Sequence, residues 1–67
     1  MIEIQLNGQA HSLDRPLTLS ALLTQLGLLQ RPVAVERNGE IVPRSRLDQE
    51  RVEAGDRIEI VQAIGGG

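Results

Sequence analysis

The chain has 67 residues, a formal net charge of −2, and neither aromatic residues nor cysteine, so it forms one small domain with a core of Leu, Ile and Val. Without cysteine, a disulfide framework and a cysteine-based zinc site are excluded, and charges scattered without basic runs argue against nucleic acid as a partner. No stretch is long or apolar enough for a membrane span or a signal peptide, so we expect a cytoplasmic protein. We also expect the protein to be monomeric when alone.

The first thirteen residues predict a β-hairpin. Apolar and polar residues alternate over residues 2–6, which is the period of a half-buried strand. Asn7-Gly8 favours the positive φ angles of a type I′ turn, so residues 9–13 are expected to return antiparallel. The sequence Asp-Arg-Pro at residues 14–16 ends the second strand.

One short amphipathic helix is predicted after the hairpin. Thr18 is a suitable N-cap, and Gly27 can take the left-handed conformation that ends a helix, leaving Leu28 to pack over its end. Between them lies one apolar stripe: Leu19, Leu22, Leu23 and Leu26. A helix of eight or nine residues does not persist alone, so it must pack on a sheet.

A second hairpin and a final strand follow. Residues 33–37 and 40–42 read as strands around a second Asn-Gly turn, and Pro43 ends the hairpin. Residues 45–51 show no clear period and leave room for a single helical turn. After a turn at residues 53–56, residues 57–63 form the last strand, with its isoleucines directed inward.

The order hairpin, helix, hairpin, strand predicts an α+β domain with one main helix across a mixed sheet of about five strands. Ubiquitin-like β-grasp proteins have this order, and that resemblance, not periodicity, implies that the last strand pairs near the first in the middle of the sheet. We expect residues 1–63 to form the domain and residues 64–67 to form a flexible glycine tail.

Side chains offer little chemistry. All seven basic residues are arginine, so no side-chain amine is available for a Schiff base or an isopeptide bond. His11 is the sole histidine and is expected to be a solvated strand or turn residue. Four acidic residues at positions 48, 50, 53 and 56 lack the spacing of an EF-hand and are expected to be hydrated. We therefore expect no metal and no bound cofactor.

The end of the sequence is the remaining candidate site. Residues 64–67 read Ile-Gly-Gly-Gly, and Gly67 would carry an α-carboxylate on a thin stalk. Four extended residues reach about 13–14 Å, enough to enter the catalytic cleft of another protein, and glycine fits a narrow channel because it lacks Cβ. From composition alone, a frayed end is an equally good interpretation.

Three stretches resemble the ThiS family of sulfur carriers of thiamine biosynthesis. They are "MIEIQLNG" at residues 1–8, "VAVERNGEIVPRS" at residues 33–45 and "GDRIEIVQAIGGG" at residues 55–67. With the helix between them they cover nearly the whole chain. A Gly-Gly end is also found in ubiquitin and in the small subunit of molybdopterin synthase, but its combination with the other motifs is specific. The extra Gly65 is a minor departure that leaves Gly66-Gly67 intact.

The resemblance implies that the chain is a macromolecular substrate and not an enzyme. A ThiF-type adenylating enzyme would use ATP to adenylate the Gly67 carboxylate, and persulfide sulfur would displace AMP and leave a thiocarboxylate. A ThiG-type thiazole synthase would then place that sulfur in the thiazole ring. Gly67 is thus the expected site of modification, and Ile64, Gly65 and Gly66 are expected to bind the partners.

Strand alternation predicts where the partner docks. If the isoleucines of the last strand point inward, Val61 and Ala63 point outward beside the tail, and Ala34 faces outward from the third strand. We predict that these three residues form an exposed apolar patch that contacts the activating enzyme. The alternative is that they are isolated exposed apolar residues. For Arg44 we keep two interpretations, a polar contact with the partner or a loop-stabilising role.

Three other functions compete with this interpretation. A carrier like the small subunit of molybdopterin synthase would share the glycine end and the thiocarboxylate but deliver sulfur to a different precursor. A ubiquitin-like modifier would be conjugated to target lysines. A plain β-grasp interaction module would carry the tail incidentally.

Overall fold

We describe the fold from a computed structural model of the chain, which describes residues 1–62. Ala63 and the predicted tail at residues 64–67 lie outside the described residues. The described part contains β1 (Ile2–Leu6), β2 (Gln9–Leu13), α1 (Leu19–Gln25), β3 (Val33–Arg37), β4 (Glu40–Val42), a 3₁₀ turn η1 (Arg44–Arg46) and β5 (Arg57–Gln62). The predicted order of hairpin, helix, hairpin and final strand is therefore confirmed.

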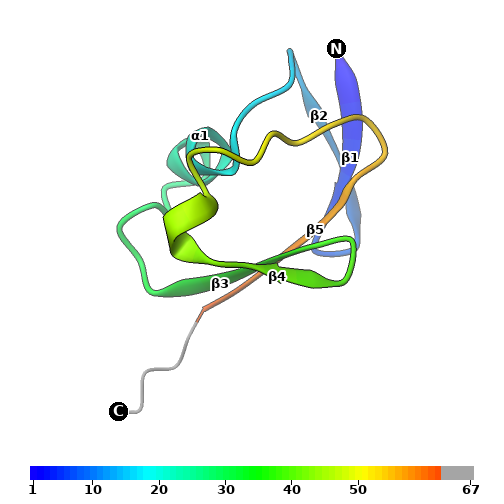
Figure 1. The fold of residues 1–67 in the computed structure, drawn as a ribbon. Helices are drawn as coiled ribbons and strands as arrows, with labels where there is room; N and C mark the ends of the chain where they lie inside the picture. Colours follow the sequence, from blue (N-terminus) through cyan, green and yellow to red (C-terminus); the bar gives the residue numbers. More distant parts are fainter. Residues whose placement is uncertain (63–67) are drawn as a thin grey trace.

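The five strands form one mixed sheet in the order β2-β1-β5-β3-β4 (Figure 1). β1 pairs antiparallel with β2, and β3 pairs antiparallel with both β4 and β5. β5 runs parallel to β1, with only two residue pairs in register. The last strand thus lies in the middle of the sheet, as the β-grasp resemblance implied.

Both hairpin turns have the predicted geometry. Asn7 and Gly8 have φ angles of 51° and 83°, and Asn38 and Gly39 have φ angles of 53° and 88°. Positive φ at both central residues defines the type I′ turn, whose twist matches that of the flanking strands. The two Asn-Gly dipeptides therefore fix the register of both hairpins.

The helix has the predicted N-cap and the predicted terminating glycine, but at seven residues it is one or two residues shorter than expected. The Thr18 hydroxyl accepts a hydrogen bond from the Ala21 backbone N–H at 3.1 Å. At the other end Gly27 has φ = 74°, and the Leu28 N–H donates to the Leu23 carbonyl at 2.8 Å. This is the pattern of a Schellman motif, which satisfies carbonyls that the helix end would otherwise leave free.

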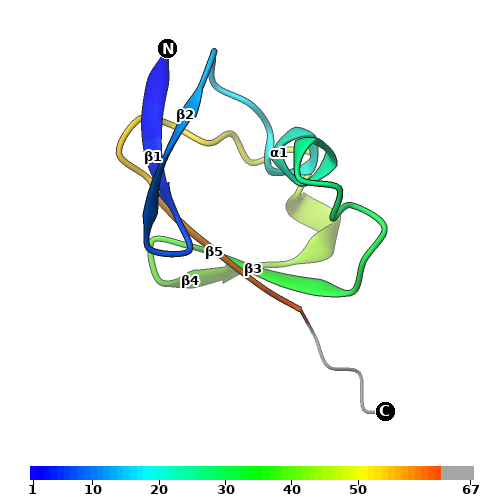
Figure 2. The same ribbon diagram turned by 180° about the vertical axis from the view of Figure 1, so that it is seen from behind.

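The core lies between α1 and one face of the sheet, which curves around the helix (Figure 2). Ten apolar residues are buried: Ile4, Leu13, Leu19, Leu22, Leu23, Val35, Leu47, Val52, Ile58 and Ile60. Two of them come from the segment between β4 and β5, which had shown no period. It is held in place by backbone hydrogen bonds such as Val52 N–H to the Leu17 carbonyl at 2.7 Å. Among the described residues, no helix has the length and apolarity to cross a membrane.

Candidate functional site: the outer face of the sheet

The second face of the sheet is not covered by any described element, and β5 shows its alternation most clearly. Ile58 and Ile60 are 0% and 9% exposed, whereas Arg57, Glu59 and Val61 are exposed on the opposite face. Val61 is 60% exposed, which is unusual for a large apolar side chain so near the middle of a sheet. The predicted orientation of β5 is confirmed over the residues that the structure describes.

Ala34 lies directly beside Val61, because the two residues are cross-strand partners in the β3–β5 register. Ala34 is exposed, as predicted. A third apolar residue, Ile41 of β4, is 70% exposed on the same face and stands opposite Glu36. Sequence analysis missed Ile41, although alternation with the half-buried Val42 could have found it. We call the outward residues of β3, β4 and β5 the outer face: Ala34, Glu36, Ile41, Arg57, Glu59 and Val61.

The side chain of Asn7 holds the end of β5 in position. Its amide oxygen accepts a hydrogen bond from the Ile60 N–H at 2.8 Å, and its amide nitrogen donates to the Ile60 carbonyl at 3.3 Å. These bonds continue the ladder that the Asn7 N–H begins with the Ile58 carbonyl at 2.9 Å. The Asn-Gly turn therefore also anchors the strand that leads to the glycines.

A polar network anchors the start of β5. The carboxylate of Asp56 accepts hydrogen bonds from Arg37 Nε at 3.0 Å, from the Asn38 side chain at 3.1 Å and from the Glu53 backbone N–H at 2.8 Å. Asn38 also accepts a hydrogen bond from the Arg57 N–H at 2.9 Å. This network ties the β3–β4 turn to the first residue of β5.

Burial raises the pKa of the Asp56 carboxyl, but other influences outweigh it. The Glu53 N–H, the Asn38 amide and the positive charge of Arg37 all favour the charged form, so the pKa of Asp56 lies below its ordinary value. Asp56 is only 9% exposed. Our prediction that this carboxylate is simply hydrated is therefore wrong, because sequence spacing does not reveal the arginine that reaches it from β3.

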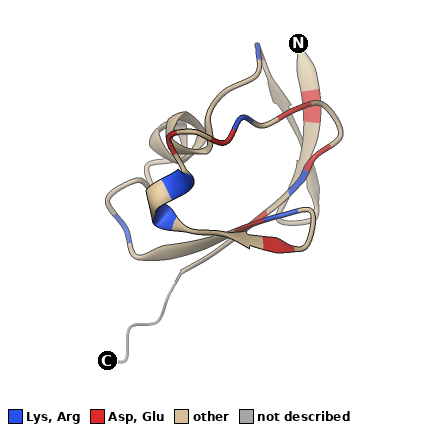
Figure 3. Ribbon diagram, in the orientation of Figure 1, with Lys and Arg blue, Asp and Glu red and all other residues tan. Residues whose placement is uncertain are grey.

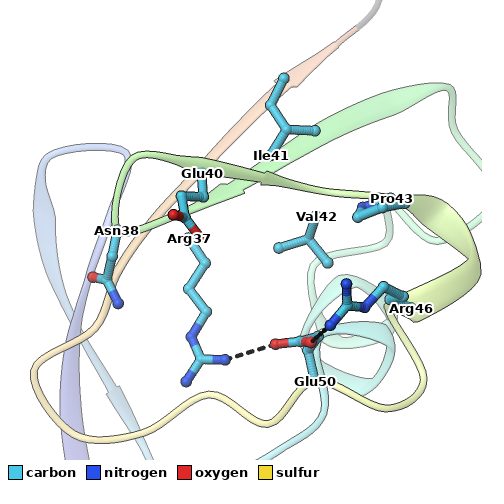
Figure 4. Close-up of a pocket in the computed structure, with 8 residues that line it drawn as sticks. All are labelled: Arg37, Asn38, Glu40, Ile41, Val42, Pro43, Arg46 and Glu50. Atoms are coloured by element: carbon cyan, nitrogen blue, oxygen red, sulfur yellow. Dashed lines mark hydrogen bonds and ion pairs between the residues drawn. The ribbon is translucent and has the colours of Figure 1, made fainter.

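Glu50 is also ion-paired, contrary to the same prediction. Its carboxylate, in the segment after η1, contacts Arg37 of β3 at 2.9 Å and Arg46 of η1 at 3.1 Å (Figure 4). These side chains lie at an open hollow of about 410 Å³, and the side chain of Ile41, which also lines it, projects from β4 on the side opposite Glu50 (Figure 4). Across residues 1–62, no group of three His, Cys, Asp or Glu side chains could hold a metal ion.

Arg44 and His11 have structural positions. Arg44 donates to the Leu29 carbonyl at 2.9 Å and to the Arg31 carbonyl at 3.2 Å, so it holds the loop before β3. This supports the loop-stabilising interpretation. His11 is half-buried in β2, opposite Ile4, and is less solvated than predicted. Figure 3 shows acidic and basic residues interspersed along the described chain.

Most of the predicted site residues cannot be placed. Ala63, Ile64, Gly65, Gly66 and Gly67 lie outside the described residues. The structure does bring together Val61 and Ala34 as cross-strand partners, and Val61 lies on β5, the strand that leads directly into this segment.

A mixed five-stranded sheet with a central last strand and one helix across it defines a ubiquitin-like β-grasp protein. The crystal structure of thiamine biosynthesis protein ThiS from Geobacter metallireducens is similar to this fold. Its TM-score is 0.87 with 33% sequence identity, and the match covers 98% of this chain and 100% of that one.

The sequence comparisons agree with the fold. The profile of the ThiS family matches residues 4–67. The sulfur carrier protein ThiS of Escherichia coli strain K12 is 38% identical, over 98% of this chain and its own full length. The chain belongs to the ThiS family. A thiazole synthase of Paramagnetospirillum magneticum is 47% identical over 98% of this chain. The chain spans about a fifth of the length of the curated thiazole synthases that it matches.

Proposed function

We propose that this chain is a sulfur carrier of thiamine biosynthesis and that the α-carboxylate of Gly67 carries the sulfur as a thiocarboxylate. The observation that carries the proposal is the family match, which runs from residue 4 through residue 67 and so includes the glycines. The relative from Escherichia coli is named a sulfur carrier protein and matches over its full length. In this role the chain is a protein substrate of other enzymes and has no catalytic residue of its own.

The proposed reaction needs Gly67 to end in a free carboxylate. A carboxylate is an anion at neutral pH and resists nucleophilic attack, so it must be activated. A ThiF-type enzyme would join it to the α-phosphate of ATP, releasing pyrophosphate and forming an acyl adenylate. The terminal sulfur of a persulfide then attacks the acyl carbon and AMP leaves. A thiol reduces the resulting S–S bond and releases the thiocarboxylate.

A thiazole synthase is the proposed acceptor of the sulfur. Two relatives are named thiazole synthases, and the part that matches this chain is about a fifth of each. A carrier-like segment and a thiazole synthase thus occur in one polypeptide in those relatives. Joining the two replaces a dilute encounter with a tethered one, which raises the effective concentration of the sulfur donor.

The proposed docking surface for the adenylating enzyme is the apolar part of the outer face. Val61 and Ala34 are neighbours across β5 and β3, and Ala63 is proposed to extend them toward the tail. An exposed apolar patch beside the reacting end would orient the carrier so that the following residues, Ile64 to Gly66, enter the catalytic cleft. ATP would be bound by the partner and not by this chain.

Removal of Gly66 and Gly67 tests the proposal. The trimmed chain should fold normally, since the ten buried core residues all lie between residues 4 and 60. It should support no thiazole formation in a reconstituted mixture of adenylating enzyme, ATP, persulfide donor and thiazole synthase. A variant with Gly65 alone deleted restores the usual length of the stalk and should remain active. Full activity of the trimmed chain would contradict the proposal that Gly67 carries the sulfur.

A further inference from the structure

Two glutamates face each other at the centre of the outer face. Glu36 of β3 and Glu59 of β5 are direct cross-strand partners in an antiparallel pair. Both side chains point away from the core, since Val35 and Ile60 on either side are buried. The Cβ atoms of such partners lie about 4.5–5.5 Å apart, and like charges directly opposite each other destabilise a sheet.

Neither glutamate takes part in an ion pair within residues 1–62. The three ion pairs of the described chain all join Arg37 or Arg46 to Glu50 or Asp56. Arg37 follows Glu36 in sequence, but alternation turns it to the other face, where it contacts Asp56. Arg57 is on the same face as Glu59 and makes no ion pair with either glutamate. The two carboxylates therefore face each other without an ion-pair partner in the described structure, which is an arrangement that general principles predict to be destabilising.

Apolar side chains border the glutamate pair on two sides. Val61 and Ala34 are the next outward pair along β5 and β3, and Ile41 of β4 stands opposite Glu36. Any protein that covers these apolar residues also removes water from the two carboxylates. Burying a carboxylate without a partner is costly, so such a protein must supply a positive charge at this position.

An arginine fits this requirement better than a lysine. Its planar guanidinium carries five donors and can hydrogen-bond two carboxylates at once, and it is desolvated more easily than an ammonium group. We propose that the adenylating enzyme docks on the outer face with an arginine placed between Glu36 and Glu59. The identity of this partner rests on the proposed function, whereas the need for a cation rests on the strand register, the lack of an ion pair and the apolar border of the glutamate pair.

The test compares Glu36→Gln and Glu59→Gln with Glu3→Gln, which removes the same charge from the same sheet face. Glu3 is exposed near the far end of β1 and lies beyond the two residue pairs that join β1 to β5. Binding to the purified ThiF-type enzyme of the same organism is measured without ATP, so the result does not depend on sulfur transfer. Each outer-face variant should raise Kd about tenfold, and its Kd should depend less steeply on ionic strength than that of the wild type. Glu3→Gln should bind like the wild type.

Thermal unfolding of the free variants gives a second test, in which stability should change in the opposite direction to affinity. Because Glu36→Gln and Glu59→Gln remove a like-charge contact, each should raise Tm by about 1–5 °C while it weakens the complex. If the two glutamates merely stabilised the fold, their substitution would lower both Tm and the affinity for the enzyme. Outer-face variants that bind as tightly as Glu3→Gln, or a wild-type chain that does not bind the enzyme, would overturn the proposal.

Thiocarboxylate formation at saturating enzyme separates this inference from the proposed function. If Kd shifts as expected but no thiocarboxylate forms on the wild-type chain, the docking inference stands and the sulfur-carrier function fails. If thiocarboxylate forms while the glutamate variants bind normally, the function stands and the docking inference is wrong.

Discussion

Asp56 shows how single side chains determine the position of the last strand. Its carboxylate joins Arg37 and Asn38, at the β3–β4 turn, to the backbone of Glu53 in the turn before β5. Asn7 has the same role from the other hairpin, through its two hydrogen bonds to Ile60. Each Asn-Gly turn thus supplies both the backbone geometry of a hairpin and a side chain that holds β5.

The lowered pKa of Asp56 predicts an acid-dependent loss of stability. A carboxyl group whose folded pKa is depressed stabilises the fold above its unfolded pKa, and that contribution is lost as the pH falls through the folded pKa. We therefore expect the free energy of unfolding to decrease when the pH is lowered below about 4. Asp56→Asn should lower it by about 1–3 kcal/mol at pH 7, because Arg37 and the Glu53 N–H lose their charged acceptor.

Urea unfolding between pH 2 and pH 7 measures this effect. Asp56→Asn should show a flatter acid dependence than the wild type, whereas Asp14→Asn, at an exposed position with no side-chain hydrogen bond in the described structure, should follow the wild type. Wild-type stability of Asp56→Asn at pH 7 would contradict the structural role given to this network.

At the scale of elements, β5 contributes to the core with one face and, in the proposed complex, contacts the partner with the other. Its inward isoleucines are buried, while Val61 is open and paired with Ala34. Neighbouring strands on both sides supply its backbone hydrogen bonds. A substitution on its outer face can therefore change docking with little effect on folding.

Val61→Asp tests this separation. The charge should weaken the complex with the adenylating enzyme at least tenfold, since it must be desolvated in an apolar contact. The free domain should retain its circular dichroism spectrum and unfold cooperatively. Ala10→Asp, on the exposed edge strand β2, is the matched control and should bind normally. Equal binding by both variants would exclude the apolar patch from the interface.

Local patterns predicted the elements because the hairpins and the helix are built from contacts close in sequence. Alternation and the Asn-Gly turns located all five strands, and Thr18 and Gly27 marked the helix ends. The segment between β4 and β5 was harder. Leu47 and Val52 are buried there without any period, because backbone contacts with α1 and the segment before it fix their positions.

At the scale of the whole molecule, the parallel pairing of β1 with β5 was beyond local reasoning. It joins residues near opposite ends of the chain, such as Gln5 and Arg57, and only the β-grasp resemblance implied it. The same limit applied to the candidate site. Alternation predicted Val61 and Ala34 separately, but their contact and the Glu36–Glu59 pair depend on the β3–β5 register.

The fold explains why so small a protein suits a carrier's role. Its described residues bury one apolar core and offer one uncovered sheet face, and the central strand leads out of the sheet toward the glycines. The domain would then provide recognition, while the partner enzymes provide the catalysis. The central claim is therefore about one carbonyl carbon, that of Gly67.

Intact-protein mass spectrometry tests that claim most directly. After incubation with ATP, a persulfide donor, a thiol and the adenylating enzyme, the chain should gain the mass difference between one sulfur and one oxygen. Fragmentation should assign the gain to Gly67, and omission of ATP should abolish it. An unchanged mass in the complete mixture, or a gain located elsewhere in the chain, would contradict the account.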